Sequence, residues 1–331
     1  MISVNNRAAA VVAAMIEAQE ELGLGVTRLD NGATVIDAGI VAPGSLEAGR
    51  MFAVACMGGL GRVHFVHNAY DAGTIVSGGC PESWPNAGFW LPAVTVDVDR
   101  PHLACMASQY AGWAVRKGSF SAIGSGPARA LACEEEIFRK IEYRDTADTA
   151  VMMFEGRTVP DSAVAAHIAE KCGVQPENVR LLIAPTASLV GSVQIAARSV
   201  ETCLHKLMEL GFDIRRVTAA YGTCPLAPVA ADDIRAMGRT NDAILYGSMV
   251  FIAVDAGDEE VADLIESIPS SSSRDYGTSF LDLFKRYGGD FYKIDRMLFS
   301  PARVEINAIR SGRVFGAGRV NRPLLKASLL E

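Results

Sequence analysis

The segment from residue 178 to 211 constrains the fold most, because it has the pattern of a strand, a loop and a helix. Residues 178–184 form a predicted buried strand, 185–192 a loop of small and hydroxyl-bearing residues, and 193–210 a helix that ends at Gly211. Strands and helices alternate elsewhere as well, so we predict a mixed α/β (α+β) chain. Ligands of open α/β sheets bind outside the carboxyl ends of strands, where this loop would lie.

Length and charge limit the number of domains and the class of partner. At roughly 150 residues per domain, the 331 residues predict two domains. We assign residues 1–150 and a C-terminal hairpin at about 300–331 to the first, and 151–299 to the second. The formal net charge is −7, so the chain lacks the excess of basic residues that is typical of nucleic-acid binders.

Cysteine usage and hydropathy indicate a cytoplasmic protein that does not enter the membrane. The seven cysteines are scattered without a CxxC pair, which is typical of reduced thiols. The apolar stretch 8–16 is followed by acidic residues instead of a cleavage site, and it reads as an amphipathic helix. No window approaches the length of about 18 apolar residues that a membrane span needs.

Two hairpins and two further helices follow from local patterns. Residues 25–39 place Asn31-Gly32 between two strands, and residues 303–315 form a similar ribbon, so we expect both hairpins in one sheet. Helical patterns cover residues 103–116 and 160–172. The segment 68–90, rich in Gly, Pro and aromatic residues, is interpreted as a long loop before a strand at 91–98.

The histidines and cysteines do not predict a metal site. His64 and His67 are the only close histidine pair, and a zinc site needs three or four converging ligands. We therefore expect no metal.

A glycine-rich loop, Gly124-Ser-Gly-Pro-Ala-Arg-Ala130, precedes a helical run and has two interpretations. It lacks the third glycine of a dinucleotide fingerprint and the Lys of a P-loop. It is either a structural turn or an anion-binding loop, in which backbone amides and Arg129 face the ligand.

Arg198 and Glu201 lie three residues apart on the predicted helix 193–210, so their side chains can meet. A solvated surface ion pair is one explanation. Their position directly after the hydroxyl-rich loop, which contains Thr186 and Ser188, favours a functional one. A carboxylate base with an arginine partner suits the activation of water against an electrophile that is already positively charged.

The chain resembles the methenyltetrahydromethanopterin cyclohydrolases, pterin-dependent one-carbon enzymes of methanogenic archaea and methylotrophic bacteria. The resemblance runs from residue 3 to the carboxyl end and rests on several ordered blocks. These are Asn31-Gly-Ala-Thr-Val-Ile-Asp37, Cys56-Met-Gly-Gly-Leu60, Ala111-Gly-Trp113, Gly124-Ser-Gly-Pro-Ala-Arg-Ala130, Ala184-Pro-Thr-Ala-Ser188, Gly238-Arg-Thr-Asn-Asp-Ala-Ile-Leu-Tyr-Gly247, Asp290-Phe-Tyr-Lys-Ile-Asp295 and Ser300-Pro-Ala-Arg303. The long 68–90 segment is the departure from archaeal members and resembles the bacterial branch.

The resemblance implies hydrolysis of the methenyl bridge of 5,10-methenyltetrahydromethanopterin to the 5-formyl product, in formaldehyde oxidation. It implies two domains that enclose a pterin pocket, no prosthetic group, and a homo-oligomer, trimeric in archaeal members. The family's arginine and glutamate fall on Arg198 and Glu201, which implies that Glu201 is the general base and that Arg198 orients it.

Six further residues are candidates for holding the pterin, and two other functions stay open. The candidates are Thr186, Ser188, Ser125, Arg129, Asn241 and Asp242. For the last two, which lie in the longest family block, a structural role in a turn is the alternative. The open functions are an amidine hydrolase for another folate-like pterin and a pterin-binding subunit without turnover.

Overall fold

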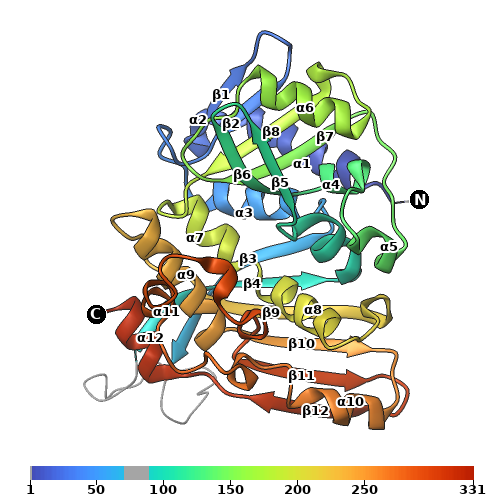
Figure 1. Cartoon of the computed structure of the whole chain (residues 1–331), viewed down its shortest axis with the longest axis vertical. Helices are drawn as coiled ribbons and strands as arrows, with labels where there is room; N and C mark the ends of the chain where they lie inside the picture. The colour runs from blue at the N-terminus through green and yellow to red at the C-terminus, as the bar shows by residue number, and fades with distance from the viewer. Residues whose placement is uncertain (1, 71–88) are drawn as a thin grey trace.

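The chain folds into two six-stranded sheets with helices packed on and between them. The structure is a computed structural model that describes residues 2–70 and 89–331. The first sheet lies in the upper half of Figure 1 and the second in the lower half, with helices α3 (Leu46–Cys56) and α7 (Leu189–Ala196) between them. The mixed α/β class predicted from the sequence is confirmed.

The first sheet is covered by helices on both faces. Helices α1 (Val4–Glu17) and α3 pack on one face, and α4 (Ala128–Ala132) and α6 (Ser162–Cys172) on the other. Its strands, in spatial order, are β1 (Gly25–Arg28), β2 (Thr34–Asp37), β8 (Val179–Ala184), β7 (Ala150–Glu155), β6 (Phe120–Ser125) and β5 (Trp113–Lys117). Strands β2, β8 and β7 run parallel, so their carboxyl ends meet at one edge of the sheet.

The second sheet has one face covered by α8 (Ser199–Glu209), α9 (Asp233–Gly247) and the π-helix His102–Gln109. Its strands, in spatial order, are β12 (Arg313–Gly318), β11 (Arg303–Ala308), β10 (Met249–Val254), β9 (Val217–Pro225), β4 (Phe89–Val98) and β3 (Gly61–Tyr70). Only β10 and β11 are parallel; the other neighbours are antiparallel.

Shorter helices complete the described part of the chain. The α-helices are α2 (Gln19–Leu22), α5 (Ile137–Ile141), α10 (Asp258–Ile265), α11 (Phe280–Arg286) and α12 (Arg322–Leu329). Single 3₁₀ turns occur at Pro176–Asn178, Ile214–Arg216, Ser270–Ser272, Phe291–Lys293 and Arg296–Leu298. None of the helices in the described ranges is both long and apolar enough to cross a membrane.

The sheets do not follow the predicted division at residue 150. The first sheet takes strands from residues 25–37, 113–125, 150–155 and 179–184, on both sides of that position. The two hairpins were expected in one sheet, and this is wrong, because β1 and β2 join the first sheet and β11 and β12 the second. Parallel pairing of β11 with β10, a long-range contact, decides where the C-terminal hairpin lies.

Two local predictions change as well. The helix expected over 103–116 ends at Gln109, and residues Trp113–Lys117 form β5, whose buried and exposed side chains alternate with the period of a strand. The ends of the segment 68–90 are not loop, because strand pairing continues to Tyr70 and resumes at Phe89. The rest of that predicted loop lies outside the described residues.

Candidate active site

The helix predicted over 193–210 is two helices, and Arg198 lies at the break between them. The first helix begins at Leu189, so the second half of the predicted loop 185–192 is helical. Helix α7 ends at Ala196, and α8 begins after Arg198, which is its N-cap residue. The backbone N–H of Arg198 bonds the Ile195 carbonyl at 2.9 Å, a tighter turn than that of an α-helix. The break places Arg198 at the start of α8 and Glu201 in its first turn.

The Arg198 guanidinium is held by hydrogen bonds from three directions. Its Nε donates to Gln194 Oε1 at 3.1 Å, Nη1 to the Gln109 carbonyl at 2.8 Å, and Nη2 to Ser125 Oγ at 3.2 Å. Burial lowers the pKa of Arg198, but the nearby Cys56, Glu201 and Glu155 outweigh it and raise the pKa above its ordinary value. Arg198 is therefore a fixed positive charge.

The Glu201 carboxylate lies beside this guanidinium without being bound by it tightly. Its Oε2 is 3.6 Å from Arg198 Nη1, and the two side chains are 8% and 13% exposed. No hydrogen bond reaches Glu201 from any other residue in the described ranges. A buried carboxylate normally accepts several hydrogen bonds. Because Glu201 lacks such partners within the described part of the chain, its oxygen lone pairs are suited to accept a hydrogen bond from a water molecule or from an N–H of a ligand.

A hydrogen-bonded chain extends from Arg198 to the edge of the first sheet. Gln194 Nε2 donates to Glu155 Oε2 at 3.2 Å, and Thr186 Oγ1 donates to Glu155 Oε1 at 2.5 Å. Glu155 ends β7, and Thr186 follows the parallel strand β8, so strand pairing brings the two residues together. Glu155 is not among the residues predicted from the sequence, although its position at the end of a buried strand is a signal of the kind that predicted the loop after β8.

The two predicted residues of the loop after β8 have different environments. Thr186 belongs to the chain just described. Ser188 is the N-cap of α7: its Oγ accepts from the Gly191 N–H at 2.9 Å and donates to the Pro185 carbonyl at 2.7 Å. A Cβ on Gly191 would lie only 2.2 Å from that carbonyl, so the tight turn requires glycine. Ser188 therefore has a structural role in this arrangement.

Ser125 and Arg129, predicted to share an anion-binding loop, separate in the structure. Ser125 contacts Arg198, and it also lies beside the thiol of Cys56, whose pKa is raised by burial. Arg129 is fully buried, and its Nε and Nη2 bond both oxygens of Glu135 at 2.8 and 2.7 Å. The anion-binding interpretation is wrong for Arg129, because its guanidinium is enclosed by protein groups and faces no ligand.

Asn241 and Asp242, predicted as ligand contacts or turn residues, lie within α9. Asn241 donates to the Met237 carbonyl one turn earlier. Asp242 accepts hydrogen bonds from the Phe280 N–H at 2.8 Å and from Ser328 Oγ at 2.6 Å. Burial raises the pKa of Asp242 to about 7. Asp242 thus links α9 to α11 and α12, a structural role outside the Arg198 network.

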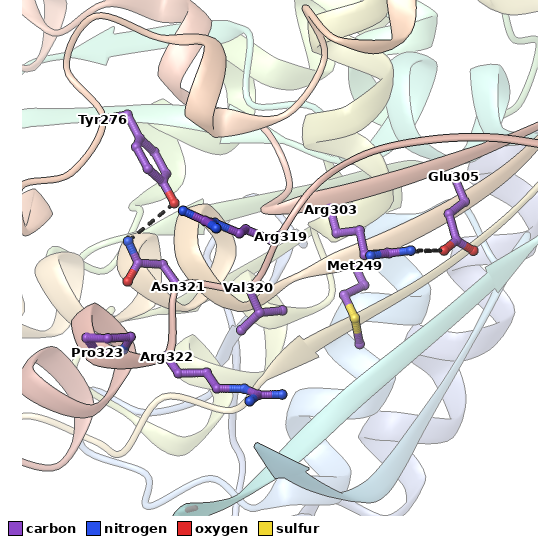
Figure 2. Close-up of a pocket in the computed structure, with 9 residues that line it drawn as sticks. All are labelled: Met249, Tyr276, Arg303, Glu305, Arg319, Val320, Asn321, Arg322 and Pro323. Carbon is purple, nitrogen blue, oxygen red and sulfur yellow. Dashed lines mark hydrogen bonds and ion pairs between the residues drawn. The ribbon is translucent and has the colours of Figure 1, made fainter. Parts of the chain in front are cut away.

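Within the described residues, no metal-binding cluster and no residue lining a cavity of about 840 Å³ belongs to this network. Among residues 2–70 and 89–331, no group of three or more His, Cys, Asp or Glu side chains is arranged to hold a metal ion. That cavity lies on the second sheet, and none of the predicted site residues lines it (Figure 2). The candidate active site is therefore the Arg198 network, defined as Arg198, Glu201, Gln194, Glu155 and Ser125.

Comparison with known proteins finds one family over nearly the whole chain. The model of the cyclohydrolase (MCH) family matches residues 3–329. The chain is 42% identical to the methenyltetrahydromethanopterin cyclohydrolase of Methanocaldococcus jannaschii, over 99% of this chain and 98% of the relative. The enzyme of the same name from Methanothermobacter marburgensis is 44% identical, over 99% of this chain and 99% of the relative. The one from Methylobacillus flagellatus is also 44% identical, over 98% of this chain and 95% of the relative.

Proposed function

The chain belongs to the cyclohydrolase (MCH) family, and we propose that it hydrolyses 5,10-methenyltetrahydromethanopterin to 5-formyltetrahydromethanopterin. Membership confirms the resemblance drawn from the sequence blocks. The observation that carries the proposal is the buried Glu201 carboxylate, 3.6 Å from a fixed arginine and free of other hydrogen bonds within the described chain.

In the proposed mechanism Glu201 is the general base. The methenyl carbon is part of a cationic amidine and is already electrophilic, so the enzyme has to position a water molecule and accept its proton. Glu201 takes that proton as the water oxygen bonds to carbon. This kind of assistance is typically worth about 10²–10⁴-fold in rate.

The second half of the reaction returns the proton. As the bond from the former methenyl carbon to N10 breaks, the protonated Glu201 delivers its proton to N10. The hydroxyl proton of the adduct is lost as the formyl carbonyl forms. The bond to N5 stays intact, and one proton is released per turnover, which balances the reaction.

Arg198 has two roles in this proposal. Its positive charge beside Glu201 favours the ionised carboxylate, the form that can accept a proton. Its hydrogen bonds to Gln194, Ser125 and the Gln109 carbonyl fix the guanidinium, so the position of Glu201 is fixed as well. Gln194 and Glu155 are positioning residues, because they act on Glu201 only through Arg198.

The substrate test compares two pterins with the wild-type protein. Loss of the methenyl absorbance is followed for methenyltetrahydromethanopterin and for methenyltetrahydrofolate. We expect rapid hydrolysis of the first and much slower hydrolysis of the second. Equal rates would favour a less selective amidine hydrolase, and binding without hydrolysis of either would indicate a non-catalytic pterin-binding subunit.

We propose that the reaction needs no metal or prosthetic group, because the substrate carbon carries the positive charge that a Lewis acid would otherwise supply. Activity should therefore survive dialysis against a chelator. Loss of activity with recovery on adding zinc would contradict this part of the proposal.

We also propose a homo-oligomer. Tyr221 and Phe251 are paired across β9 and β10, and they are 47% and 39% exposed on the sheet face opposite the buried Val250 and Ile252. Adjacent exposed aromatic side chains are typical of an interaction surface. Light scattering should give a multiple of the 35.2 kDa chain mass, whereas a monomer mass would contradict the proposal.

A further inference from the structure

A second candidate binding site lies on the open face of the second sheet. The cavity of about 840 Å³ is bounded by the first residues of β10 and β11 and by the segment from Arg319 to Pro323, which leads into α12. Met249 and Arg303 are paired across β10 and β11, so their side chains share one face of the sheet. The volume is within the range of about 300–1,000 Å³ typical of small-molecule sites.

The polar lining of this cavity is strongly basic. It contains three arginines, Arg303, Arg319 and Arg322, and a single carboxylate, Glu305. Arg303 pairs with Glu305 at 2.7 Å, while Arg319 and Arg322 make no ion pair within the described ranges. The lining therefore carries a charge of +2, in a chain whose net charge is −7. Exposed guanidinium groups gathered in a cavity repel one another and attract anions.

Tyr276 and Asn321 add a fixed polar group to the lining. Asn321 Nδ2 donates to the Tyr276 hydroxyl at 3.3 Å, which leaves the hydroxyl proton of Tyr276 available to a ligand. The Tyr276 ring packs against Tyr246 with the centroids 5.2 Å apart, so the hydroxyl is held in place. Figure 2 shows the Arg319 guanidinium turned toward this hydroxyl.

Apolar side chains form the rest of the lining. Met249, Val320 and Pro323 contribute no charge and no side-chain donor. A ligand of matching chemistry has a compact anionic head for the two unpaired guanidinium groups and an organic part for the apolar wall. Arginine recognises phosphate through paired hydrogen bonds, and a dianionic phosphate matches two unpaired guanidiniums better than a single carboxylate does.

We propose that this cavity binds a small phosphate monoester, with its phosphate on Arg319 and Arg322 and its organic group against Met249, Val320 and Pro323. The site is separate from the Arg198 network and does not depend on the proposed hydrolytic function.

The test is calorimetric titration of the full chain with phenyl phosphate, inorganic phosphate and phenol. We expect phenyl phosphate to bind more tightly than inorganic phosphate and phenol not to bind. In the double variant Arg319→Gln/Arg322→Gln, affinity for phenyl phosphate should fall about tenfold or more, because charge-assisted hydrogen bonds are lost. Binding should also weaken as salt rises.

The matched control is Arg28→Gln/Arg116→Gln, which removes the same charge from exposed strands of the first sheet. This control should bind phenyl phosphate as the wild type does, and both double variants should keep the wild-type rate of pterin hydrolysis. Failure of the wild type to bind phenyl phosphate, or equal binding by the Arg319/Arg322 variant, would overturn the proposal. Equal affinity for phenyl phosphate and inorganic phosphate would overturn the assignment of a monoester.

Discussion

Two arginine–carboxylate pairs lie at the end of the π-helix, and they differ in how the carboxylate is held. Arg129 binds both oxygens of Glu135, at 2.8 and 2.7 Å, and uses Nη1 on the carbonyls of Met106 and Ser108. Arg198 instead bonds Gln194, Ser125 and the Gln109 carbonyl, and Glu201 stays 3.6 Å away. The carbonyls of Ser108 and Gln109 are adjacent, so the two guanidiniums bind consecutive residues.

The difference separates a structural pair from a candidate catalytic pair. Arg129 and Glu135 use their hydrogen bonds on each other, which stabilises the packing of the π-helix against α4 and leaves nothing for a ligand. The Arg198 guanidinium donates its hydrogen bonds to other groups. Its positive charge still favours the ionised form of Glu201, and the Glu201 oxygens remain available to a ligand. A π-helix is uncommon and often occurs near functional sites.

The largest expected effect is on catalysis. Glu201→Gln keeps the shape of the side chain but removes the proton acceptor, so kcat should fall about 10²–10⁴-fold. The absorbance assay measures this directly. Glu209→Gln, at the exposed end of the same helix, should keep the wild-type kcat. Undiminished hydrolysis by Glu201→Gln would show that the Arg198–Glu201 pair is structural, like the Arg129–Glu135 pair.

The next effect is on stability and concerns Arg129. Arg129→Met leaves Glu135 and two carbonyls without their partner, and loss of one member of a buried pair typically costs about 3–5 kcal/mol of unfolding free energy. Urea unfolding measures the change. The exposed Arg139→Met is the control and should change stability by less than about 0.5 kcal/mol. An equally small change for Arg129→Met would show that this pair is not a structural clamp.

Asp242 extends the comparison to a buried carboxylate that accepts hydrogen bonds from Phe280 and Ser328 and has no arginine partner among the described residues. Its pKa of about 7 in the folded protein exceeds the ordinary 3.8, so the folded state binds the proton more tightly than the unfolded state does. The protonated Asp242 therefore contributes fully to the free energy of unfolding below about pH 4, and this contribution is lost as the pH rises through about 7. The full pKa difference corresponds to about 4 kcal/mol.

Asp242→Asn removes this titration and should make the protein more stable at pH 8, by about 2–4 kcal/mol. Urea unfolding between pH 4 and 8 should give a flatter profile for the variant. Asp263→Asn, on the exposed face of α10, should leave the profile unchanged. A stability difference between Asp242→Asn and the wild type that does not vary with pH would contradict this account.

The smallest expected effect concerns the positioning residues. In Glu155→Gln the new amide no longer fixes the orientation of Gln194, so Arg198 is held less well and kcat should fall about tenfold, or about 1.4 kcal/mol. Adding Gln194→Leu should lower kcat little further, because both residues act through Arg198. The exposed Glu170→Gln on α6 is the control. An unchanged kcat in Glu155→Gln would remove Glu155 from the site.

The sequence predicted the parts of the site that depend on local spacing. The strand at 178–184, the start of a loop at residue 185 and the closeness of Arg198 and Glu201 all follow from patterns within about 30 residues, although the loop ends at Ser188 rather than at residue 192. The break between α7 and α8 did not follow, because neither glycine nor proline marks residues 197–198. Its effect is to place Arg198 as the N-cap residue of α8 rather than inside one long helix.

Contacts between distant segments could not be read from the sequence. Glu155 meets Gln194 and Thr186 because β7 and β8 pair in parallel, and nothing local predicts that pairing. Arg129 beside a glycine-rich loop suggested an anion site, but its burial depends on the packing of Glu135, Tyr110 and Phe138 around it. Charge and loop composition do not distinguish a guanidinium that faces a ligand from one enclosed by protein.

The most direct test of the central claim, that Arg198 acts through Glu201, is a double-mutant cycle. kcat is measured for Arg198→Lys, Glu201→Gln and the double variant. Residues that act as a unit give strongly non-additive losses. We therefore expect the double variant to be about as slow as Glu201→Gln alone. Losses that multiply in the double variant would contradict the claim, because each residue would then contribute to catalysis independently.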